Sequence, residues 1–270
     1  MTSFCVHVWN EAAALERLVR SSLPLADLIS EWVILDHRSD DETPQVIESL
    51  RPLLDNHGIA LVTAREERDL SPDFTFADVR NRALELCSSD VIVLHDADFI
   101  LGPGFRGMLE RAVLGVSRGD AYAAAFTVPV VWDRLVVDEA GTVKDHGRVW
   151  VHRRRPRIFR RGTVRYEQTK QGGRWERLIA LDRRRPRVVP LTPLRVLKHG
   201  VVSVNVKPAE RIALRETMTM YMQDAMQGRV KRPWLEAYKA GEVRKQLPYK
   251  YQDLDLRGWS LYSDALELTA

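Results

Sequence analysis

The sequence VIVLHDADF, Val91 to Phe99, decides the fold. Its first four residues are apolar, as in a strand that is buried on both faces, and two carboxylates, Asp96 and Asp98, follow almost at once. On an extended backbone residues i and i+2 point to the same side, so these two charges would repel each other. Burying both is costly unless a cation compensates them. The stretch therefore predicts a buried strand that ends at a charged site.

Upstream of this stretch, short apolar runs alternate with amphipathic segments. Strands are expected at residues 4–8, 32–35, 59–63 and 91–95, and helices at 11–19, 43–57 and 76–87. Parallel strands need crossover helices, and consecutive βαβ units are right-handed. The alternation therefore predicts an α/β fold with a doubly wound, mostly parallel sheet that is covered by helices on both faces.

Polar residues follow each expected strand. They are Asn10 and Glu11 after the first, Asp36, Asp40 and Asp41 after the second, Arg65 and Glu66 after the third, and Asp96 and Asp98 after the fourth. The carboxyl ends of parallel strands meet at one edge of a sheet, where ligands bind in folds of this kind. A hard divalent cation there would take carboxylate oxygens and leave positions for substrate phosphates. The sequence thus predicts a metal and diphosphate site.

Several of these residues also have a purely structural explanation. Asn10 could cap a helix whose first turn holds Glu11. Asp40 and Asp41 could be acids at the start of the next helix, which Thr43 could cap. Arg80 could pair with Asp78 or Glu85 on a helix surface. A second Asp-x-Asp, Asp253 to Asp255, follows no expected strand, so the pattern without its position is weak evidence.

The composition is that of a globular protein. With 270 residues, 45% of them hydrophobic, the chain can bury one large domain or one domain with an appendage. Its apolar runs are shorter than the ~20 residues of a membrane-spanning helix, and the opening MTSFCVHVWNE lacks the pattern of a signal peptide. A soluble cytoplasmic protein is expected. Cys5 and Cys87 lie in apolar segments, which predicts buried, reduced thiols.

Positive charge is concentrated in the middle of the chain. The net charge is +4, yet residues 144–187 hold sixteen Lys or Arg against four Asp or Glu. This segment is expected to face something anionic, such as phosphates, nucleic acid or a membrane surface. The alternative is a solvated basic face that pairs with acidic loops elsewhere.

Four segments resemble the family 2 glycosyltransferases, whose fold is called GT-A. Trp9 to Ala12 resembles the opening Asn-Glu of that family, and DHRSDDET, Asp36 to Thr43, resembles its DDGSTDGT. The other two matches are Val79-Arg80-Asn81, similar to Ala-Arg-Asn, and His95-Asp96-Ala97-Asp98, similar to the DxD motif. The matches occur in the family's order over about residues 4 to 105.

The resemblance implies an enzyme that transfers a sugar from a nucleotide-sugar donor, with Mn²⁺ or Mg²⁺ at the diphosphate. UDP-sugars are the commonest donors of the family, although His37 and Arg38 replace the usual Asp and Gly. The resemblance implies that Asp36 contacts the nucleobase and that Asn10 and Glu11 shape the nucleotide pocket. It implies that Arg80 supports the phosphates or the aspartates. Asp96 would contact the ribose or the metal, and Asp98 would bind the metal.

Two further residues are implied for the metal and the chemistry. In many GT-A enzymes a downstream histidine completes the metal site, and His199 occupies such a position. Inverting transfer needs a general base, usually a carboxylate. Gly173-Arg174-Trp175-Glu176 resembles the family's Gly-x-His-Glu, so Glu176 is the expected base, with Glu167 and Asp133 in reserve.

The expected organisation is a nucleotide-sugar-binding half at 1–130, an acceptor-facing half with the basic segment at 131–206, and a helical C-terminal extension or lid at 207–270. The basic segment admits a nucleic acid, a lipid phosphate, or a small sugar or phosphorylated acceptor. Two alternatives remain open. One is a nucleotidyltransferase, although NEAAALERL lacks the Gly-rich loop typical of that class. The other is a non-catalytic nucleotide- or nucleic-acid-binding module.

Overall fold

The computed structural model describes residues 1–102, 104–119, 123–126, 129–131, 135–137, 143–146, 149–151, 155–168, 176–181, 188–191, 201–204 and 209–243. A central sheet of seven strands has the order β14-β6-β11-β4-β1-β2-β3. Its strands are β1 (Thr2–Val8), β2 (Ile29–Asp36), β3 (Ala60–Arg65), β4 (Val91–Leu94), β6 (Ala123–Phe126), β11 (Arg155–Arg160) and β14 (Val188–Leu191). The first four strands are mutually parallel, and β11 runs antiparallel to both of its neighbours. The mostly parallel α/β sheet expected from the sequence is therefore confirmed.

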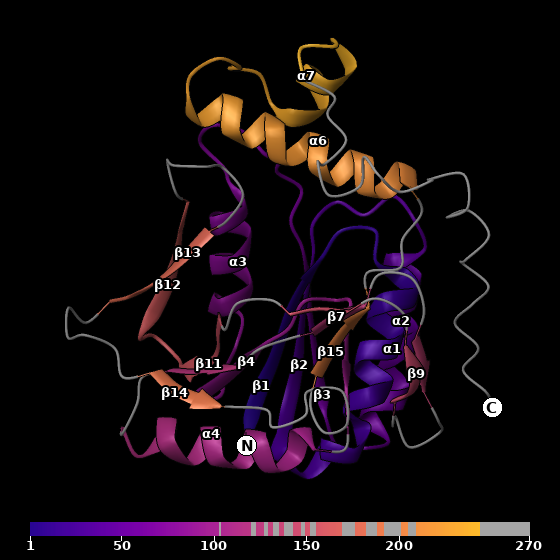
Figure 1. Ribbon diagram of the computed structural model, residues 1–270, viewed down its shortest axis with the longest axis vertical. Helices are drawn as coiled ribbons and strands as arrows, with labels where there is room; N and C mark the ends of the chain where they lie inside the picture. The colour runs from indigo at the N-terminus through magenta and orange to yellow at the C-terminus, as the bar shows by residue number, and fades with distance from the viewer. Residues whose placement is uncertain are drawn as a thin grey trace.

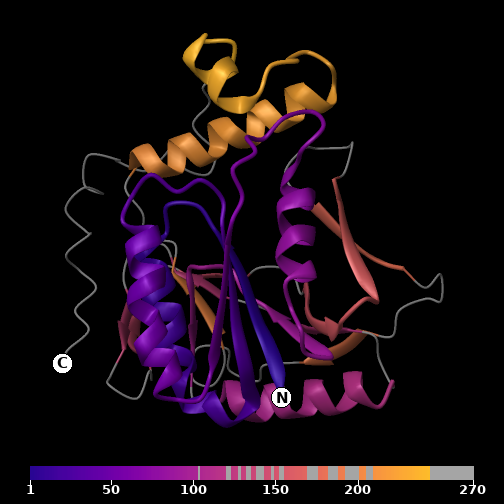
Figure 2. The ribbon, with the colours of Figure 1, turned by 180° about the vertical axis from the view of Figure 1, so that it is seen from behind.

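Helices cover both faces of this sheet (Figures 1 and 2). One face packs against α1 (Ala12–Ser22), α2 (Thr43–Asp55) and α4 (Phe105–Ser117) through a core that includes Phe4 and Trp32. The other face packs against α3 (Phe76–Glu85), α6 (Ala209–Met226) and α7 (Trp234–Lys239). Alternate residues of β1 serve the two cores, because successive side chains of a strand point to opposite faces. A short 3-10 helix, η1 (Leu23–Leu28), joins α1 to β2.

Smaller sheets flank the central one. A four-stranded sheet has the order β10-β7-β15-β5, with β5 (Phe99–Leu101), β7 (Pro129–Val131), β10 (Val149–Val151) and β15 (Val201–Val204). Two antiparallel pairs are formed by β8 (Leu135–Val137) with β9 (Val143–His146), and by β12 (Val164–Gln168) with β13 (Glu176–Ala180). The β12–β13 pair lies beside α3 in both views (Figures 1 and 2). Glu176, at the start of β13, lies 3.1 Å from Arg80 of α3.

Local sequence explains where the helices begin. At α3, Thr75 and Asp78 form a capping box, in which each side chain pairs with the backbone N–H of the other. At α2 the Asp41 side chain accepts a hydrogen bond from the Thr43 N–H, so the structural explanation of Asp41 is confirmed and Thr43 is not the cap. The capping role expected for Asn10 is wrong, because the residue at the N-cap of α1 is Glu11.

The C-terminal helices lie across the carboxyl ends of the central strands (Figure 1). Met218, Tyr221 and Met222 of α6 are buried, so this methionine-rich stripe is core packing. Backbone contacts fix α7: the Trp234 N–H donates to the Leu70 carbonyl at 2.8 Å. In the described part of the chain, no helix has both the length and the apolar character needed to cross a membrane.

Both cysteines behave as expected. Cys5 of β1 and Cys87, just after α3, are buried free thiols, and each Sγ lies 3.5 Å from the Ala83 carbonyl oxygen. Hydrogen bonding to Cys87 and burial raise the pKa of the Cys5 thiol well above its ordinary value. A thiol that stays protonated is a poor nucleophile and metal ligand, so Cys5 belongs to the core.

Candidate functional site

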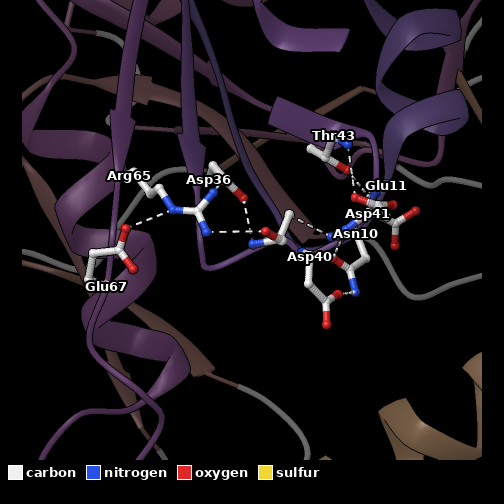
Figure 3. Close-up of polar contacts among 9 residues, drawn as sticks. Asn10, Glu11, Asp36, Asp40, Asp41, Thr43, Arg65 and Glu67 are labelled. Atoms are coloured by element: carbon white, nitrogen blue, oxygen red, sulfur yellow. Dashed lines mark hydrogen bonds and ion pairs between the residues drawn. The ribbon is translucent and has the colours of Figure 1, made fainter. Parts of the chain in front are cut away.

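The first group of predicted residues meets where β1 and β2 end. We call Asn10, Ser39, Asp40, Asp41 and Thr43 the loop network, because hydrogen bonds join the loop after β1 to the loop after β2 (Figure 3). The network is possible because β1 and β2 are adjacent and in register, with Val8 opposite Asp36. Residues about thirty positions apart in the chain thus form one polar edge.

Asn10 is the centre of the loop network. Its backbone is left-handed, with φ of 53°, a conformation that asparagine tolerates better than most residues. Its Oδ1 accepts hydrogen bonds from the backbone N–H of Asp40 at 2.7 Å and of Asp41 at 3.4 Å, and its Nδ2 donates to the Asp40 carboxylate. Asn10 therefore holds the second loop in place. Glu11 joins the same contact through its backbone, whose N–H donates to the Thr43 hydroxyl at 2.8 Å.

Asp36, the last residue of β2, is buried beside this network. Its Oδ1 accepts from the Ser39 N–H at 3.0 Å, and its Oδ2 accepts from Arg65 at 2.6 Å. Arg65 ends the neighbouring strand β3 and also contacts Glu67 at 2.7 Å (Figure 3). Both oxygens of Asp36 thus already have donors, and a nucleobase N–H would have to share or replace the Arg65 contact.

A pocket of about 290 Å³ opens next to Arg65. Aromatic side chains from three parts of the chain line it: Trp9 after β1, Phe76 at the start of α3, and Trp234 of α7. Charged side chains complete it, among them Arg38 and Asp69, which form an ion pair at 3.4 Å. We call this the nucleotide-side pocket, after the nucleotide role that the resemblance implies for Asp36 beside it. Flat rings beside hydrogen-bonding groups are what a planar aromatic ligand requires.

Three predicted residues, Arg80, Asp96 and Glu176, lie together with Arg157 and Tyr166, and we call these five residues the arginine cluster. Arg157 of β11 binds both carboxylate oxygens of Asp96, one of them at 2.9 Å. Arg80 of α3 lies 3.6 Å from Asp96 and 3.1 Å from Glu176. Arg80 also lies over the Tyr166 ring, with the guanidinium carbon 5.3 Å from the ring centre. The alternative explanation, in which Arg80 pairs with Asp78 or Glu85 on a helix surface, is therefore wrong.

Burial and charge act in opposite directions in this cluster. Burial alone would raise the pKa of the Asp96 carboxyl, but the guanidiniums of Arg157 and Arg80 outweigh it and hold that pKa well below its usual range. Burial would likewise lower the pKa of Arg80, and the carboxylates of Glu176 and Asp96 raise it instead. Asp96 and Arg80 are therefore charged at neutral pH, and each stabilises the charged form of the other.

Arg157 is the residue that sequence reasoning missed. It lies in the basic run Arg153 to Arg161, in which no spacing distinguishes one arginine from another. The signal is its place on a strand: β11 pairs with β4, and Ile158 lies opposite Val93. This pairing brings Arg157 close to Asp96, just beyond the end of β4. Only knowledge that β11 adjoins β4 could have found it.

Asp96 and Asp98 do not sit on one extended segment. Strand β4 ends at Leu94, and the Phe99 N–H donates to the Asp96 carbonyl at 3.1 Å, which closes a turn. The prediction that both carboxylates point to the same side assumed a strand, so its basis is wrong. Asp98 has different neighbours: burial lowers the pKa of Arg17 in α1, and the charges of Glu11 and Asp98 partly offset that effect.

The described residues do not by themselves form a complete site for a divalent cation. Among them, no three His, Cys, Asp or Glu side chains gather as a protein-only metal site would require. Asp96 is already bound through both oxygens to Arg157 and does not fit as a ligand in this arrangement. Asp98 fits better, because Mg²⁺ at phosphates commonly uses one or two carboxylates with substrate oxygens and water.

The remaining candidates are the histidine expected at the metal and the three candidate bases. His199 and the reserve base Asp133 lie outside the described residues. The other reserve, Glu167, is on the exposed side of β12, where it pairs with Arg165. The side chain of Glu176 is 9% exposed and contacts Arg80, so of the two described candidates only Glu176 adjoins the cluster.

A buried histidine, His95, and a half-buried one, His7, border the site. His95 precedes Asp96 and packs among aromatic rings, with centroids 4.7 Å from Phe4 and 5.5 Å from Trp32. Neither of its ring nitrogens has a hydrogen-bond partner among the described residues. Burial, aided by the charge of Arg157, lowers its pKa to about 3. His7 of β1 has a pKa of about 3 for similar reasons, burial first and the charge of Arg80 second. Both are neutral at physiological pH.

Residues 3–183 match the family model of glycosyl transferase family 2. This match spans more than half of the chain, so the protein belongs to that family and the sheet is of the expected GT-A type. Membership argues against a nucleotidyltransferase. No curated protein matches the sequence at a significant level.

Solved structures of glycosyltransferases give distant matches. TarS 1–349 of S. aureus in complex with UDP-GlcNAc is 19% identical, with 52% of this chain and 36% of that chain covered and a TM-score of 0.34. The same protein in complex with UDP is 15% identical, with 96% of this chain and 74% of that chain covered and a TM-score of 0.44. Glucosyl-3-phosphoglycerate synthase of Mycobacterium tuberculosis, in complex with Mg²⁺ and UDP, is 21% identical, with 52% of this chain and 44% of that chain covered and a TM-score of 0.32. The chain thus spans about a third of the length of the first of these structures.

Proposed function

We propose that this glycosyltransferase moves a sugar from a UDP-sugar to an acceptor hydroxyl with inversion, and that Glu176 is the general base. The observation that carries the proposal is the position of Arg80, which contacts Asp96 after β4 and Glu176 at the start of β13. A single guanidinium thus links the DxD segment, where the diphosphate is expected, to the carboxylate that would activate the acceptor. Family membership supports the same reaction class.

On the donor side, the proposal assigns the nucleobase and ribose to the nucleotide-side pocket. Trp9, Phe76 and Trp234 supply aromatic surface, and Asp36 lies directly behind Arg65. Asn10 would act by holding the loop that carries Ser39 and Asp40, whereas Glu11 and Asp98 would share the region near Arg17. Asp96 would orient Arg80 and Arg157 toward the donor phosphates.

The chemical step is a displacement at the anomeric carbon. Glu176 takes the proton of the acceptor hydroxyl as its oxygen forms the new bond to that carbon, and the bond to the diphosphate oxygen breaks. Arg80 positions Glu176, since the two groups are 3.1 Å apart. A divalent cation, held by Asp98 and by His199 as a further ligand, would neutralise charge on the departing diphosphate.

The donor assignment is tested by thermal unfolding with UDP, GDP, UDP-glucose and UDP-N-acetylglucosamine, each with and without Mn²⁺. A ligand that binds only the folded state stabilises it by mass action, by about 2.7 kcal/mol at a hundredfold excess over Kd. We expect a shift with UDP ligands that needs Mn²⁺ in the wild type and is weakened by Asp98→Asn. If none of these ligands changes the midpoint at millimolar concentration, the proposal fails.

The base assignment is tested by Glu176→Gln. This variant retains the size of the side chain but cannot accept the proton, so sugar transfer should be lost while the UDP-dependent thermal shift is unchanged. Glu167→Gln is the matched control, because Glu167 is an exposed glutamate on the adjacent strand β12. Weakened donor binding in Glu176→Gln would instead give Glu176 a place on the donor side.

A further inference from the structure

A second cavity, of about 250 Å³, opens on the acceptor side of the arginine cluster. It lies between α3, β11 and the β12–β13 pair, and Arg80, Arg157, Tyr166, Glu176 and Arg177 line it, with Pro156 and Leu178 as its apolar part. We call it the acceptor-side cavity. Glu176, the proposed base, forms part of its wall, so a molecule bound here would lie beside the reacting carboxylate.

The charges of this lining do not balance. Three guanidiniums, from Arg80, Arg157 and Arg177, face one carboxylate, that of Glu176. Asp96 offsets part of the excess from behind, through its contacts with Arg157 and Arg80. Glu167 lies opposite Arg177 on β12, but its carboxylate pairs with Arg165. A neutral ligand would leave this positive potential uncompensated.

Arg80 is held in the cavity wall by ion pairs. Its Nε lies 3.1 Å from the Glu176 carboxylate, and its guanidinium also lies 3.6 Å from Asp96. Hydrogen bonds between a guanidinium and an anionic oxygen are stronger than those between neutral groups. Arginine is also the side chain whose planar fork matches phosphate and carboxylate groups.

From this lining we propose that the acceptor carries a phosphate or carboxylate group, and that Arg177 binds this group in the acceptor-side cavity. The inference rests on the proposed function, in which Glu176 activates the acceptor hydroxyl. The size of the cavity, at the lower end for ligand sites, fits a small acceptor or the terminal group of one. Binding the anion there places a hydroxyl a few bonds away beside Glu176.

The test uses three small probes that share one skeleton: glycerol 1-phosphate, glycerate and glycerol. Binding is measured by calorimetry on the full chain saturated with UDP and Mn²⁺, so that the donor phosphate site is already filled. We expect one of the two anions to bind and glycerol not to bind. Arg177→Gln should weaken that anion about tenfold, the usual effect of losing one charge-assisted hydrogen bond, and should leave UDP affinity unchanged.

Arg165→Gln is the matched control. It removes the same charge from another exposed arginine of the same strand pair, but Arg165 pairs with Glu167 and does not line the cavity. Equal weakening in both variants would mean general electrostatic attraction and would overturn the inference. So would the absence of anion binding, or binding that saturating UDP abolishes. If UDP itself does not bind, the donor proposal fails, while titration of the anions against the two variants still tests the cavity.

Discussion

The loop network around Asn10 and the arginine cluster around Asp96 lie at the same edge of one sheet, yet different interactions build them. The loop network consists of short hydrogen bonds between neighbouring loops, several of them exposed to solvent. The arginine cluster consists of charges brought together from α3, β11, β13 and the turn after β4. They are mostly buried except Asp96, whose side chain is 33% exposed. The first should tolerate the loss of one group, whereas in the second each charge depends on its partners.

The largest effect is expected for Arg157→Met. This change leaves Asp96 without its bidentate partner. The Asp96 side chain is 33% exposed and Arg80 remains 3.6 Å away, so we expect a loss of about 3 kcal/mol of unfolding free energy, at the lower end for a broken buried ion pair. Urea denaturation measures the loss. The matched control is Arg106→Met, because Arg106 also binds both oxygens of a carboxylate, Asp27, but at the surface. That control should cost less than about 1 kcal/mol. Similar losses of unfolding free energy in the two variants would contradict the prediction that the arginine-cluster ion pair contributes more stability than the exposed one.

A double variant tests whether the cost lies in the orphaned charge. Arg157→Met combined with Asp96→Leu removes both charges, so part of the stability lost in Arg157→Met should return, because neighbouring sites are not additive. If the double variant is instead clearly less stable than Arg157→Met, the unpaired Asp96 does not cause the loss of stability in Arg157→Met.

An intermediate effect that depends on pH is expected for His95→Phe, next to the arginine cluster. The folded pKa of about 3 lies below the ordinary value of 6.5, so the unfolded state alone takes up a proton between these values. Stability should therefore fall as pH drops from 6.5 towards 3, by about 1.4 kcal/mol per unit for this histidine. His95→Phe removes this contribution, so its advantage over the wild type should grow over the same range. If the difference in unfolding free energy between His95→Phe and the wild type is the same at pH 7 and pH 4, this prediction is wrong.

The smallest effect is expected in the loop network. Asn10→Ala removes the side-chain hydrogen bonds to Asp40 and Asp41 and places alanine in a left-handed conformation. Together these should cost about 1–3 kcal/mol, less than the loss in Arg157→Met. Asn10→Gly separates the two causes, because glycine tolerates the backbone but lacks the side chain. Thermal unfolding of the three proteins should rank them wild type, Asn10→Gly, Asn10→Ala. A cost equal to that of Arg157→Met would mean that the two regions do not differ.

The difference between the two regions also explains what the sequence could predict. The strands and helices of the first hundred residues, and the meeting of Asn10, Asp36 and Asp96 at one edge, follow from hydrophobic periodicity and from the geometry of parallel strands. The role of Arg157 could not be predicted, because it depends on the pairing of β11 with β4 across sixty residues. The Asp96–Phe99 turn also escaped prediction, because an Asp-x-Asp pattern fits an extended strand as well as a turn.

The C-terminal helices have a consequence for biosynthesis. Trp234 and Leu235 form one wall of the nucleotide-side pocket, whereas Trp9, Arg65 and Phe76 belong to the opposite end of the chain. During translation the N-terminal strands leave the ribosome first. A nascent chain that stops short of Leu235 therefore carries the sheet and the loop network but an unfinished pocket, so the proposed nucleotide binding would begin only late in synthesis.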